Sequence, residues 1–502
     1  MIQCNNVSFS YPVSKTEESF TQSGGGLKNI SCTIEDGSFV LLCGTSGCGK
    51  TTLTRLFNGL IPHYYEGTLT GSATLDGKEY KDLSLFDLSQ RVGSVFQNPR
   101  SQFFNVDTTS EVAFGCENHG MPEQDIIERV NQVSEQLHLT GLLGKSIFSL
   151  SGGEKQKIAC GSAAAVEPDI YILDEPSSNL DAYAIRDLKK LLMILKSQGK
   201  TVVIAEHRLY YLWDLADRII YLKEGVIMGD YTASEFRSIP EPERAKMGLR
   251  PLDLTDLRTI SCERTRIGGD PWKLKDFHFT YRGQKEVLSI DCAELPSANV
   301  TAIIGHNGAG KTTMFRCLCG LEKRCGGFLK KGDAIYTARQ RLRLCFMVMQ
   351  DVNHQLFTES VLDEVLLSMR HENEAAAEKI LDEMDLLPFK SRHPMGLSGG
   401  QKQRVAVASA IASERPFILF DEPTSGLDLF HMRQTADSVR RLADRGKTIM
   451  IITHDPEFIL RCCNFVIHLE NGRVKEQYSL ETEFDKEHLL DFFFTDIGGE
   501  GN

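Results

Sequence analysis

The 502-residue sequence predicts two tandem α/β domains, each built on a largely parallel β-sheet. Two observations support this prediction: a set of motifs that occurs twice in the same order, and short apolar runs that end in glycine or carboxylate residues. LSGGEKQ begins at Leu150 and LSGGQKQ at Leu397, 247 positions later, and two DEP motifs keep the same separation. The repeated unit spans roughly 230 residues, the size of one α/β domain rather than of a short solenoid repeat.

The composition disfavours several classes of protein. Hydrophobic residues make up 41% of the chain and charged residues 25%, which is typical of a folded globular protein. The net charge of −12 argues against a protein that coats nucleic acid through phosphate contacts. No apolar run approaches the ~18 residues that cross a bilayer, and the N-terminus lacks the features of a signal peptide. We therefore expect a cytosolic chain without a membrane span, whose fourteen cysteines are small buried hydrophobic residues rather than a metal or redox centre.

The duplication sets the expected domain boundaries, which are domain 1 at 1–231, a linker at 232–270, domain 2 at 271–480 and an acidic tail at 481–502. The linker has no sustained apolar periodicity and contains three prolines. The polar, Gly-rich segment 14–26 is expected to form a hairpin loop. The Phe492–Phe494 run in the tail is expected to dock onto domain 2, with a partner contact as the alternative.

A glycine-rich loop follows an apolar run in each half. Phe39–Cys43 leads into GTSGCGKTT, after which apolar residues recur at helical spacing from Leu53 to Leu60, and Val300–Ile304 leads into GHNGAGKTT. This order of strand, glycine loop and helix predicts a cradle for nucleotide phosphates, in which the lysine reaches the β and γ phosphates and the next threonine binds Mg²⁺. The expected nucleotide-binding residues here are Gly44, Thr45, Ser46, Gly47, Cys48, Gly49, Lys50, Thr51, Thr52, Gly305, His306, Asn307, Gly308, Ala309, Gly310, Lys311, Thr312 and Thr313.

Carboxylates end a second pair of apolar runs. Tyr171–Asp174 and Phe417–Asp421 are typical of buried parallel strands, whose C-terminal ends bind ligands in open α/β sheets. We expect the two aspartates to hold Mg²⁺, directly or through water. Glu175 and Glu422 follow them and are expected to polarise the attacking water.

Two further residue types recur at strand ends. His207 and His454 follow the expected strands 201–205 and 448–452, and in this setting each can hydrogen-bond the γ-phosphate and orient the water. Gln97 and Gln350 also end short apolar runs, where a neutral amide can ligate Mg²⁺ and sense the γ-phosphate. The expected Mg²⁺ ligands are Thr51, Gln97, Asp174, Thr312, Gln350 and Asp421.

The repeated S-G-G sequence precedes an apolar-periodic helix in each half. It can form an anion-binding nest at a helix N-terminus, or it can be only a capping turn. The sequence itself does not show that this nest serves a nucleotide held by the other half. The residues concerned are Ser151, Gly152, Gly153, Ser398, Gly399 and Gly400.

Over roughly residues 1–230 and 272–475, the two halves resemble ABC-type ATPase domains, chiefly through the LSGGQ-type signature ahead of DEP-x-S/T-x-x-LD. The resemblance implies two tandem P-loop NTPase domains, each with a mixed sheet core, an antiparallel β subdomain and a helical signature subdomain. It implies ATP and Mg²⁺ as cofactors and an intramolecular head-to-tail dimer. The implied composite sites pair Gly44–Thr52 with Ser398–Gly400, and Gly305–Thr313 with Ser151–Gly153.

The same resemblance assigns further residues. The aromatic side chain that stacks on adenine matches Tyr11 and Tyr281, although a strand tyrosine in the core is the alternative, and the D-loop aspartates match Asp181 and Asp428. Two departures are mild: Glu154 replaces the usual glutamine of the signature, and EHR follows the first histidine strand where the second half has THD.

Within the superfamily, FQNPRSQFF and MQDVNHQLFTESVLDEV resemble the ATPase subunits of energy-coupling factor (ECF) transporters, fused in one chain. This resemblance implies import of a vitamin or a transition-metal ion at the cytoplasmic face of the cell membrane, with no direct contact to nucleic acid. The implied partners are a transmembrane coupling subunit of the T type and a small membrane substrate-capture subunit. Phe103, Phe104, Leu356 and Phe357 would then be partly interfacial rather than core.

Two alternatives stay open. One is the fused ATPase of another ABC transporter, either a sugar importer or an exporter. The other is a soluble tandem ATPase that acts on ribosomes or nucleic acid, although no zinc module, iron–sulfur domain or long charged linker helix is evident in the sequence.

Overall fold

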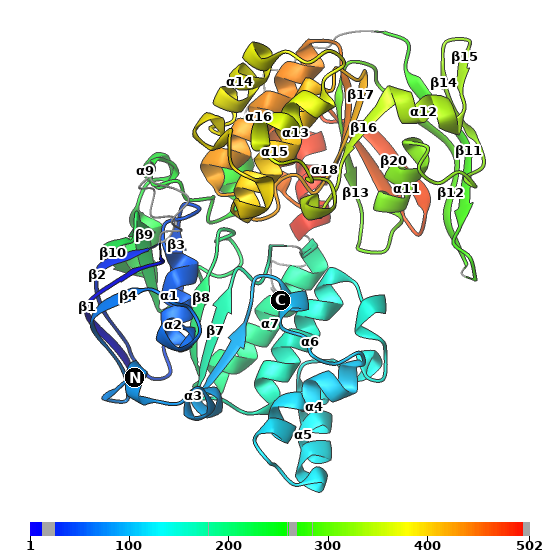
Figure 1. The fold of residues 1–502 in the computed structure, drawn as a ribbon. Coiled ribbons are helices and arrows are strands. Elements are labelled where there is room, and N and C mark those ends of the chain that lie inside the picture. Colours follow the sequence, from blue (N-terminus) through cyan, green and yellow to red (C-terminus); the bar gives the residue numbers. More distant parts are fainter. Residues whose placement is uncertain (13–25, 179, 259, 261–268, 284, 495–502) are drawn as a thin grey trace. The chain divides into compact units, whose positions relative to one another are not determined.

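The computed structural model describes residues 1–12, 26–178, 180–258, 260, 269–283 and 285–494 (Figure 1). The chain divides into two compact units, Met1–Asp253 and Leu254–Asn502. Nearly all of the expected hairpin loop at 14–26 lies outside the described residues. Within the described ranges, no helix combines the length and the apolar character needed to cross a membrane.

The first unit contains two sheets. The larger one consists of β3 (Phe39–Gly44), β6 (Val92–Val95), β7 (Ile170–Asp174), β8 (Thr201–Ala205), β9 (Arg218–Lys223) and β10 (Val226–Thr232). Their order is β10-β9-β3-β8-β7-β6, and only the β9–β10 pair is antiparallel. The smaller, antiparallel sheet has the order β2-β1-β4-β5 and consists of β1 (Ile2–Ser10), β2 (Leu27–Ile34), β4 (Thr68–Leu75) and β5 (Lys78–Glu79).

The helices of the first unit connect and cover these sheets. They are α1 (Lys50–Phe57), α2 (Leu60–His63), α3 (Leu85–Arg91), α4 (Thr108–Asn118), α5 (Glu123–Gln136), α6 (Gly152–Ala165), α7 (Ala182–Ser197), α8 (Ala233–Ser238) and α9 (Glu241–Lys246). Helices α4, α5 and α6 pack against one another as a separate helical group (Figure 1). The helix expected from Leu53 to Leu60 ends earlier, because Gly59 adopts a left-handed conformation (φ 78°) and starts α2.

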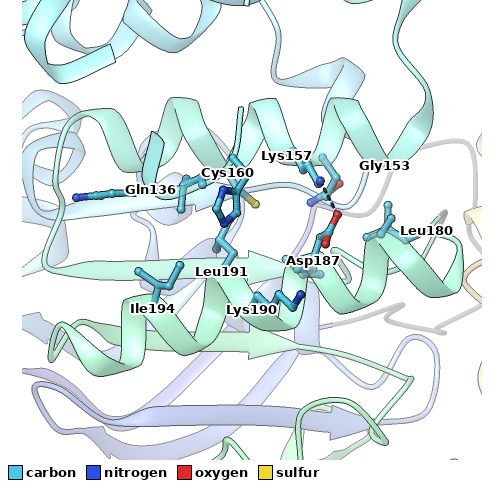
Figure 2. A pocket seen from close by; sticks show the side chains of 14 residues that line it. Gln136, Gly153, Lys157, Cys160, Leu180, Asp187, Lys190, Leu191 and Ile194 are labelled. Carbon is cyan, nitrogen blue, oxygen red and sulfur yellow. Dashed lines mark ion pairs between the residues drawn. The ribbon is translucent and has the colours of Figure 1, made fainter. Parts of the chain in front are cut away.

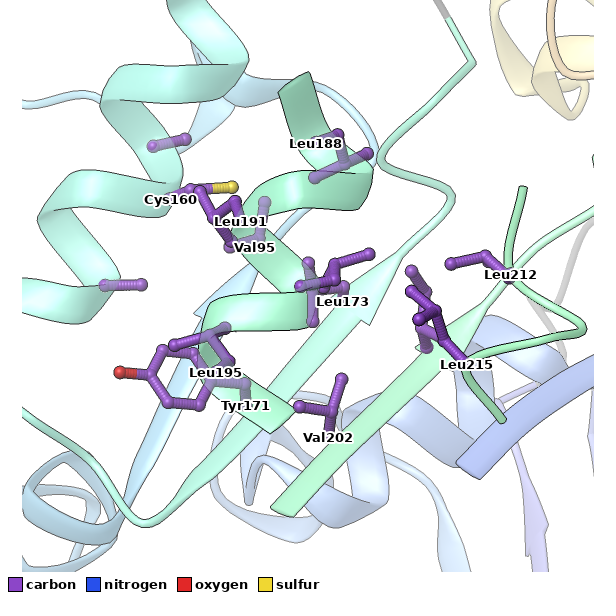
Figure 3. Close-up of a cluster of buried hydrophobic side chains, with 14 of the residues drawn as sticks. Val95, Cys160, Tyr171, Leu173, Leu188, Leu191, Leu195, Val202, Leu212 and Leu215 are labelled. Atoms are coloured by element: carbon purple, nitrogen blue, oxygen red, sulfur yellow. The ribbon is translucent and has the colours of Figure 1, made fainter. Parts of the chain in front are cut away.

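Successive side chains of β3 point to opposite faces of the sheet, so the core of the first unit consists of two clusters. Phe39 and Leu41 join a cluster on the helix-covered face, whereas Val40 and Leu42 join a cluster that includes the antiparallel sheet. A strand buried on both faces is what the apolar run predicted. On the helix-covered face, side chains of α7 lie against those of β7 and β8 (Figure 3). The ends of the parallel strands are thereby held in a buried environment.

The second unit repeats this arrangement. Its strands are β11 (Trp272–Thr280), β12 (Glu286–Leu295), β13 (Val300–Ile304), β14 (Phe328–Lys331), β15 (Ala334–Tyr336), β16 (Cys345–Val348), β17 (Phe417–Asp421), β18 (Thr448–Ile452), β19 (Phe465–Glu470) and β20 (Arg473–Ser479). The sheet orders are β12-β11-β14-β15 and β16-β17-β18-β13-β19-β20. The helices are α10 (Leu254–Arg258), α11 (Lys311–Leu318), α12 (Ala338–Leu344), α13 (Val361–Ser368), α14 (Glu374–Glu383), α15 (Gly399–Ala412), α16 (Leu429–Asp444), α17 (Pro456–Cys462) and α18 (Glu483–Phe494).

The first unit extends beyond residue 231, so the expected linker at 232–270 has to be corrected. Helices α8 and α9 lie in its first part, and Phe236, Leu249 and Leu252 are at most 4% exposed and join the core of the first unit. These anchors are spaced too irregularly to produce a periodic pattern, so the sequence alone does not reveal them. The first unit accordingly ends at Asp253.

The C-terminal segment packs onto the second unit, as expected. Leu490, Phe493 and Phe494 of α18 are buried, and the ring of Phe492 lies 4.7 Å from that of His468. The cysteines in the described ranges are free thiols, and most of them are buried.

We expect Phe236→Ala to destabilise the first unit. Removing a fully buried phenylalanine from a core costs roughly 3–5 kcal/mol of unfolding free energy, whereas a true linker residue would cost almost nothing. Urea unfolding, compared with Met228→Ala at a position that is 60% exposed on β10, measures the difference. A loss below about 1 kcal/mol would show that the 233–253 segment is not part of this core.

Candidate functional site

The glycine loops connect the central strand of each sheet to a helix. Residues 44–52 run from the end of β3 into α1, and residues 305–313 run from β13 into α11. Gly47 has a φ of 74°, and a Cβ added there would meet no atom within 4 Å, so the loop has an open side. Neither α1 nor α11 carries a side-chain cap at its N-terminus, where helix amides bind anions. The loops therefore fit nucleotide phosphates.

A buried lysine lies over each loop. Lys50 Nζ donates to the carbonyls of Gly44 (3.1 Å) and Thr45 (3.2 Å) and lies 3.2 Å from His207 Nε2. Lys311 Nζ donates to the equivalent carbonyls of Gly305 (2.7 Å) and His306 (2.9 Å). Each ammonium group is held inside the loop, where it can face the phosphates.

A threonine hydroxyl and a buried carboxylate meet at each site. Thr51 Oγ1 donates to Asp174 Oδ1 (3.2 Å), and Thr312 Oγ1 donates to Asp421 Oδ2 (2.9 Å). Burial raises the pKa of Asp174 to about 7, with a further contribution from the charge of Glu175, and burial raises the pKa of Asp421 to about 6. Hard oxygen ligands that are deprived of solvent suit Mg²⁺, whose charge would favour the ionised form. These residues therefore fit the metal that accompanies a nucleotide.

In the first half, a glutamate, a histidine and a glutamine meet beside Lys50. Glu175 Oε1 lies 3.1 Å from His207 Nε2 and 3.8 Å from Lys50 Nζ, and Glu175 Oε2 accepts from Gln97 Nε2 (2.8 Å). Glu175 has a φ of 43°, and its N–H donates to the carbonyl of Ala205, which fixes the backbone at the strand end. The three predicted residues are thus brought together.

The second half reproduces this cluster only in part. Glu422 has a φ of 53°, and its Oε1 lies 3.4 Å from His454 Nε2. Gln350 is exposed after β16, and within the described residues it makes no hydrogen bond to Glu422. The structure therefore brings Gln97 to the glutamate in the first half, whereas Gln350 lies exposed after its strand in the second.

The two predicted tyrosines lie beside the loops. Tyr11 OH is 3.3 Å from Thr52 Oγ1 and accepts from Arg55 Nη1 (2.9 Å). Tyr281 OH is 3.3 Å from Thr313 Oγ1. Both rings are partly exposed rather than buried in the core, so they can contact a base that extends from the loop.

The S-G-G motifs cap helices α6 and α15. Ser151 N–H donates to Glu154 Oε2 (2.8 Å), and Glu154 N–H donates back to Ser151 Oγ (3.3 Å), which forms a capping box. Gln401 forms the same box with Ser398. Glu154 therefore replaces glutamine without loss of the cap, but it brings a carboxylate to the helix N-terminus. The capping turn that the sequence offered as an alternative is therefore present, and the S-x-x-E spacing signals its reciprocal form.

The D-loop aspartates also cap helices. Asp181 Oδ1 accepts from the N–H of Ala184 (2.8 Å) at the start of α7, and Asp428 Oδ1 accepts from the N–H of His431 (2.9 Å) at the start of α16.

Glu206 is a buried residue beside the expected site that the sequence analysis did not single out. Its buried carboxylate accepts from the N–H groups of Ser177 (2.9 Å) and His207 (2.8 Å) and from the hydroxyl of Tyr211 (2.8 Å). It therefore fixes the histidine relative to the segment after β7. In the second half Thr453 occupies the equivalent position. The sequence signal for this residue was EHR in the first half, where the second half has THD.

Comparison with known proteins decides the family. The ABC transporter family model matches residues 27–178 and 292–425. The chain belongs to the ABC transporter family of ATPases. It is 44% identical over 498 residues to a protein named "Putative ABC transporter ATP-binding protein" from Treponema denticola. The matched region covers 98% of this chain and 100% of the relative. A relative with the same name from Enterococcus faecalis is 31% identical to this chain, and the matched region covers 94% of this chain and 90% of the relative.

Solved structures agree on the fold of this tandem ABC ATPase. A structure titled "Model of ribosome-bound archaeal Pelota and ABCE1" matches with a TM-score of 0.68 at 22% identity and covers 98% of this chain and 81% of the other. At that identity the likeness shows the fold alone. As an ABC ATPase the protein hydrolyses ATP with Mg²⁺.

We expect Asp174→Asn to stabilise the nucleotide-free ABC ATPase at pH 8. Because folding raises the pKa of Asp174 from 3.8 to about 7, the stability that its proton provides is present below pH 4 and is lost as the pH rises to 7. Asparagine stays neutral, so the variant should unfold several degrees higher than the wild type at pH 8, and the difference should shrink toward pH 4.

The measurement is thermal unfolding at both pH values without nucleotide or Mg²⁺, with Asp444→Asn as the exposed-carboxylate control. If Asp174→Asn were no more stable than the wild type at pH 8, burial would not be the cause of the raised pKa of Asp174.

Proposed function

We propose that this chain is the ATPase of an ECF-type importer, which drives a separate transmembrane coupling subunit at the cytoplasmic face of the cell membrane. That subunit would carry a small substrate-capture protein for a vitamin or a transition-metal ion. The observation that supports the proposal best is a pair of equivalent loops, one in each half, that present an exposed phenylalanine on a fixed backbone. These loops contain the segments that resemble ECF ATPase subunits.

In the first half, the loop is held by Glu111. This buried carboxylate accepts from the N–H groups of Phe104 (3.0 Å) and Asn105 (2.7 Å). The ring of Phe104 is nevertheless 75% exposed and stacks on Phe114 at 5.0 Å. Two stacked rings at the surface of an ordered loop offer an apolar contact that a partner can cover.

The second half builds the same loop around Glu364. Its carboxylate accepts from the N–H groups of Phe357 (3.1 Å) and Thr358 (3.1 Å), and Phe357 is 73% exposed. Of the other two residues expected to be partly interfacial, Leu356 is buried, and Phe103 is partly buried and packs against the core. The proposed contact therefore rests on Phe104 and Phe357.

The loops also connect the proposed contact to the chemistry. Gln97 donates to Glu175 and lies seven residues before Phe104, so a displacement of the loop by a partner would change the position of Gln97. In the proposed mechanism Glu175 and Glu422 accept a proton from the attacking water, while His207 and His454 hold the γ-phosphate. The metal, when bound, neutralises charge that develops on the phosphates.

The two halves are proposed to form composite sites. Each glycine loop would face the S-G-G motif of the other half, so that a nucleotide would join the halves until hydrolysis removes its γ-phosphate. The difference in contact energy between the joined and separated states would then move the membrane subunit.

We expect Glu175→Gln together with Glu422→Gln to abolish steady-state ATP hydrolysis while ATP binding is retained. Glutamine keeps the shape and hydrogen bonds of glutamate but cannot accept the proton. Phosphate release and equilibrium binding of ATP measure the two properties, and Glu224→Gln at an exposed turn is the matched control. Near-normal turnover in the double variant would refute the base role.

We expect Phe104→Ala together with Phe357→Ala to lose the membrane partner. Because exposed aromatic anchors carry much of the energy of an interface, recovery of an integral membrane protein with the tagged chain from detergent extracts should fall by at least about tenfold. ATP binding should not change, and Phe484→Ala, a ring that is 76% exposed on α18, should behave as wild type.

The identity of the recovered proteins separates the remaining possibilities. A stoichiometric membrane subunit with a small vitamin-binding or metal-binding protein supports the proposal. Recovery of a sugar-binding system or of an exporter domain would assign the chain to another ABC transporter, and recovery of ribosomes or nucleic acid would overturn a transport role.

A further inference from the structure

An arginine on the helix that follows the first glycine loop contacts two tyrosines. Arg55 lies on α1, and its Nη1 donates to the hydroxyl of Tyr11 (2.9 Å). Its guanidinium carbon lies 4.1 Å from the centre of the Tyr65 ring, which is the geometry of a cation–π contact. The rings of Tyr11 and Tyr65 meet edge to face, with their centres 6.1 Å apart. The three side chains therefore form one cluster beside the glycine loop.

The backbone holds Tyr65 in this cluster. Its N–H donates to the carbonyl of Leu60 (2.9 Å), which closes a turn after the start of α2. Strand β4 begins three residues later and pairs with the end of β1, the strand that leads to Tyr11. A Cβ added to Gly67 would lie 2.5 Å from the carbonyl oxygen of Ser10, so a glycine is needed for this close approach. The position of Tyr65 is therefore fixed by the sheet rather than by its side chain alone.

The second half does not build this cluster. Arg316 occupies the position of Arg55, since each lies five residues after the lysine of its glycine loop. Arg316 is exposed, and its Nε donates to Glu322 Oε1 (2.8 Å). The sequence between α11 and β14, residues 319–327, contains no aromatic residue. A carboxylate therefore receives the arginine of the second half, where two tyrosines receive that of the first.

Arg55 restricts a ring that the strand does not hold. Tyr11 follows the last residue of β1 and is partly exposed, so ladder pairing does not fix its side chain. A hydrogen bond from a charged donor is stronger than one between neutral groups, and the planar guanidinium is itself held on the face of Tyr65. A ring that is fixed in advance loses less conformational entropy when a ligand packs against it. The cluster thus favours binding of whatever contacts Tyr11.

We propose that Arg55 and Tyr65 are positioning residues for the nucleotide base at the first glycine loop, because they fix the tyrosine against which the base packs. They act on the base and not on the phosphates, which the loop and Lys50 hold. The second site has no equivalent pair. The inference rests on the expected contact between Tyr11 and the base, and it does not depend on the identity of any transport partner.

The test measures binding of MgADP to the full chain by calorimetry. It also measures inhibition of ATP hydrolysis by magnesium tripolyphosphate, which carries phosphates without a base. Arg55→Met keeps an unbranched stem without the guanidinium, and it should weaken one of the two MgADP sites at least about fivefold while inhibition by tripolyphosphate is unchanged. Tyr65→Ala should have the same effect. Tyr65→Phe retains the ring face and should bind MgADP as the wild type does.

Two control variants each remove a cation elsewhere. Arg316→Met is the matched control in the second half, because that arginine contacts Glu322. Lys190→Met is the control within the first unit, where this exposed lysine lines the cavity between α6 and α7 rather than the glycine loop (Figure 2). Both variants should bind MgADP as the wild type does. A loss in Arg316→Met equal to that in Arg55→Met would overturn the assignment to the first half.

Tyr11→Ala separates the two levels of the inference. If this variant weakens MgADP but not tripolyphosphate while Arg55→Met changes neither, the positioning role of Arg55 is wrong and the base contact stands. If Tyr11→Ala leaves MgADP binding unchanged, the base contact is wrong and the inference falls with it. An equal loss of both ligands in Arg55→Met would show damage to the loop and would also overturn the inference. If Arg55→Met does not fold, the comparison of Tyr65→Ala with Tyr65→Phe decides it.

Discussion

The active regions depend on the burial of carboxylates at the ends of two parallel strands. Covering the sheet on both faces places Asp174 and Asp421 away from water, where an ionised carboxylate is unfavourable. The surrounding residues compensate: threonine hydroxyls donate to both carboxylates, and a buried lysine lies over each adjacent loop. Bound Mg²⁺ and phosphates can offset the free-energy cost of burying these charged groups that still remains. The sites are therefore arranged to bind ligands rather than to stabilise the empty protein.

The two halves share a fold but differ around their catalytic groups. Gln97 bonds Glu175 in the first half, whereas Gln350 is exposed in the second. Glu206 accepts from the N–H groups of His207, Arg208 and Ser177 and from the hydroxyl of Tyr211, while a threonine occupies its place in the other copy. Glu154 also gives the first S-G-G motif a charge that Gln401 lacks. Duplication has therefore preserved the framework while the sites have diverged.

Much of the fold and of the site follows from local sequence. The apolar runs at 201–205, 300–304, 417–421 and 448–452 are strands with the expected bounds, because a strand buried on both faces must be apolar throughout. The glycine loops were equally predictable, since they need small residues in fixed order. Three features were not: the anchor Phe236, the early end of α1 and the exposure of Gln350. The burial of Phe236 depends on contacts between distant segments, which no short pattern encodes, whereas the end of α1 follows from Gly59, a local signal that the apolar spacing does not register.

The proposed function requires a nucleotide to join the glycine loop of one half to the S-G-G motif of the other. Small-angle X-ray scattering of a hydrolysis-deficient form of the full chain tests it most directly. MgATP is expected to reduce the radius of gyration and MgADP is not, because in the proposed composite sites only the γ-phosphate would bridge the two halves. An unchanged radius with bound MgATP, or the same reduction with MgADP, would refute the composite sites.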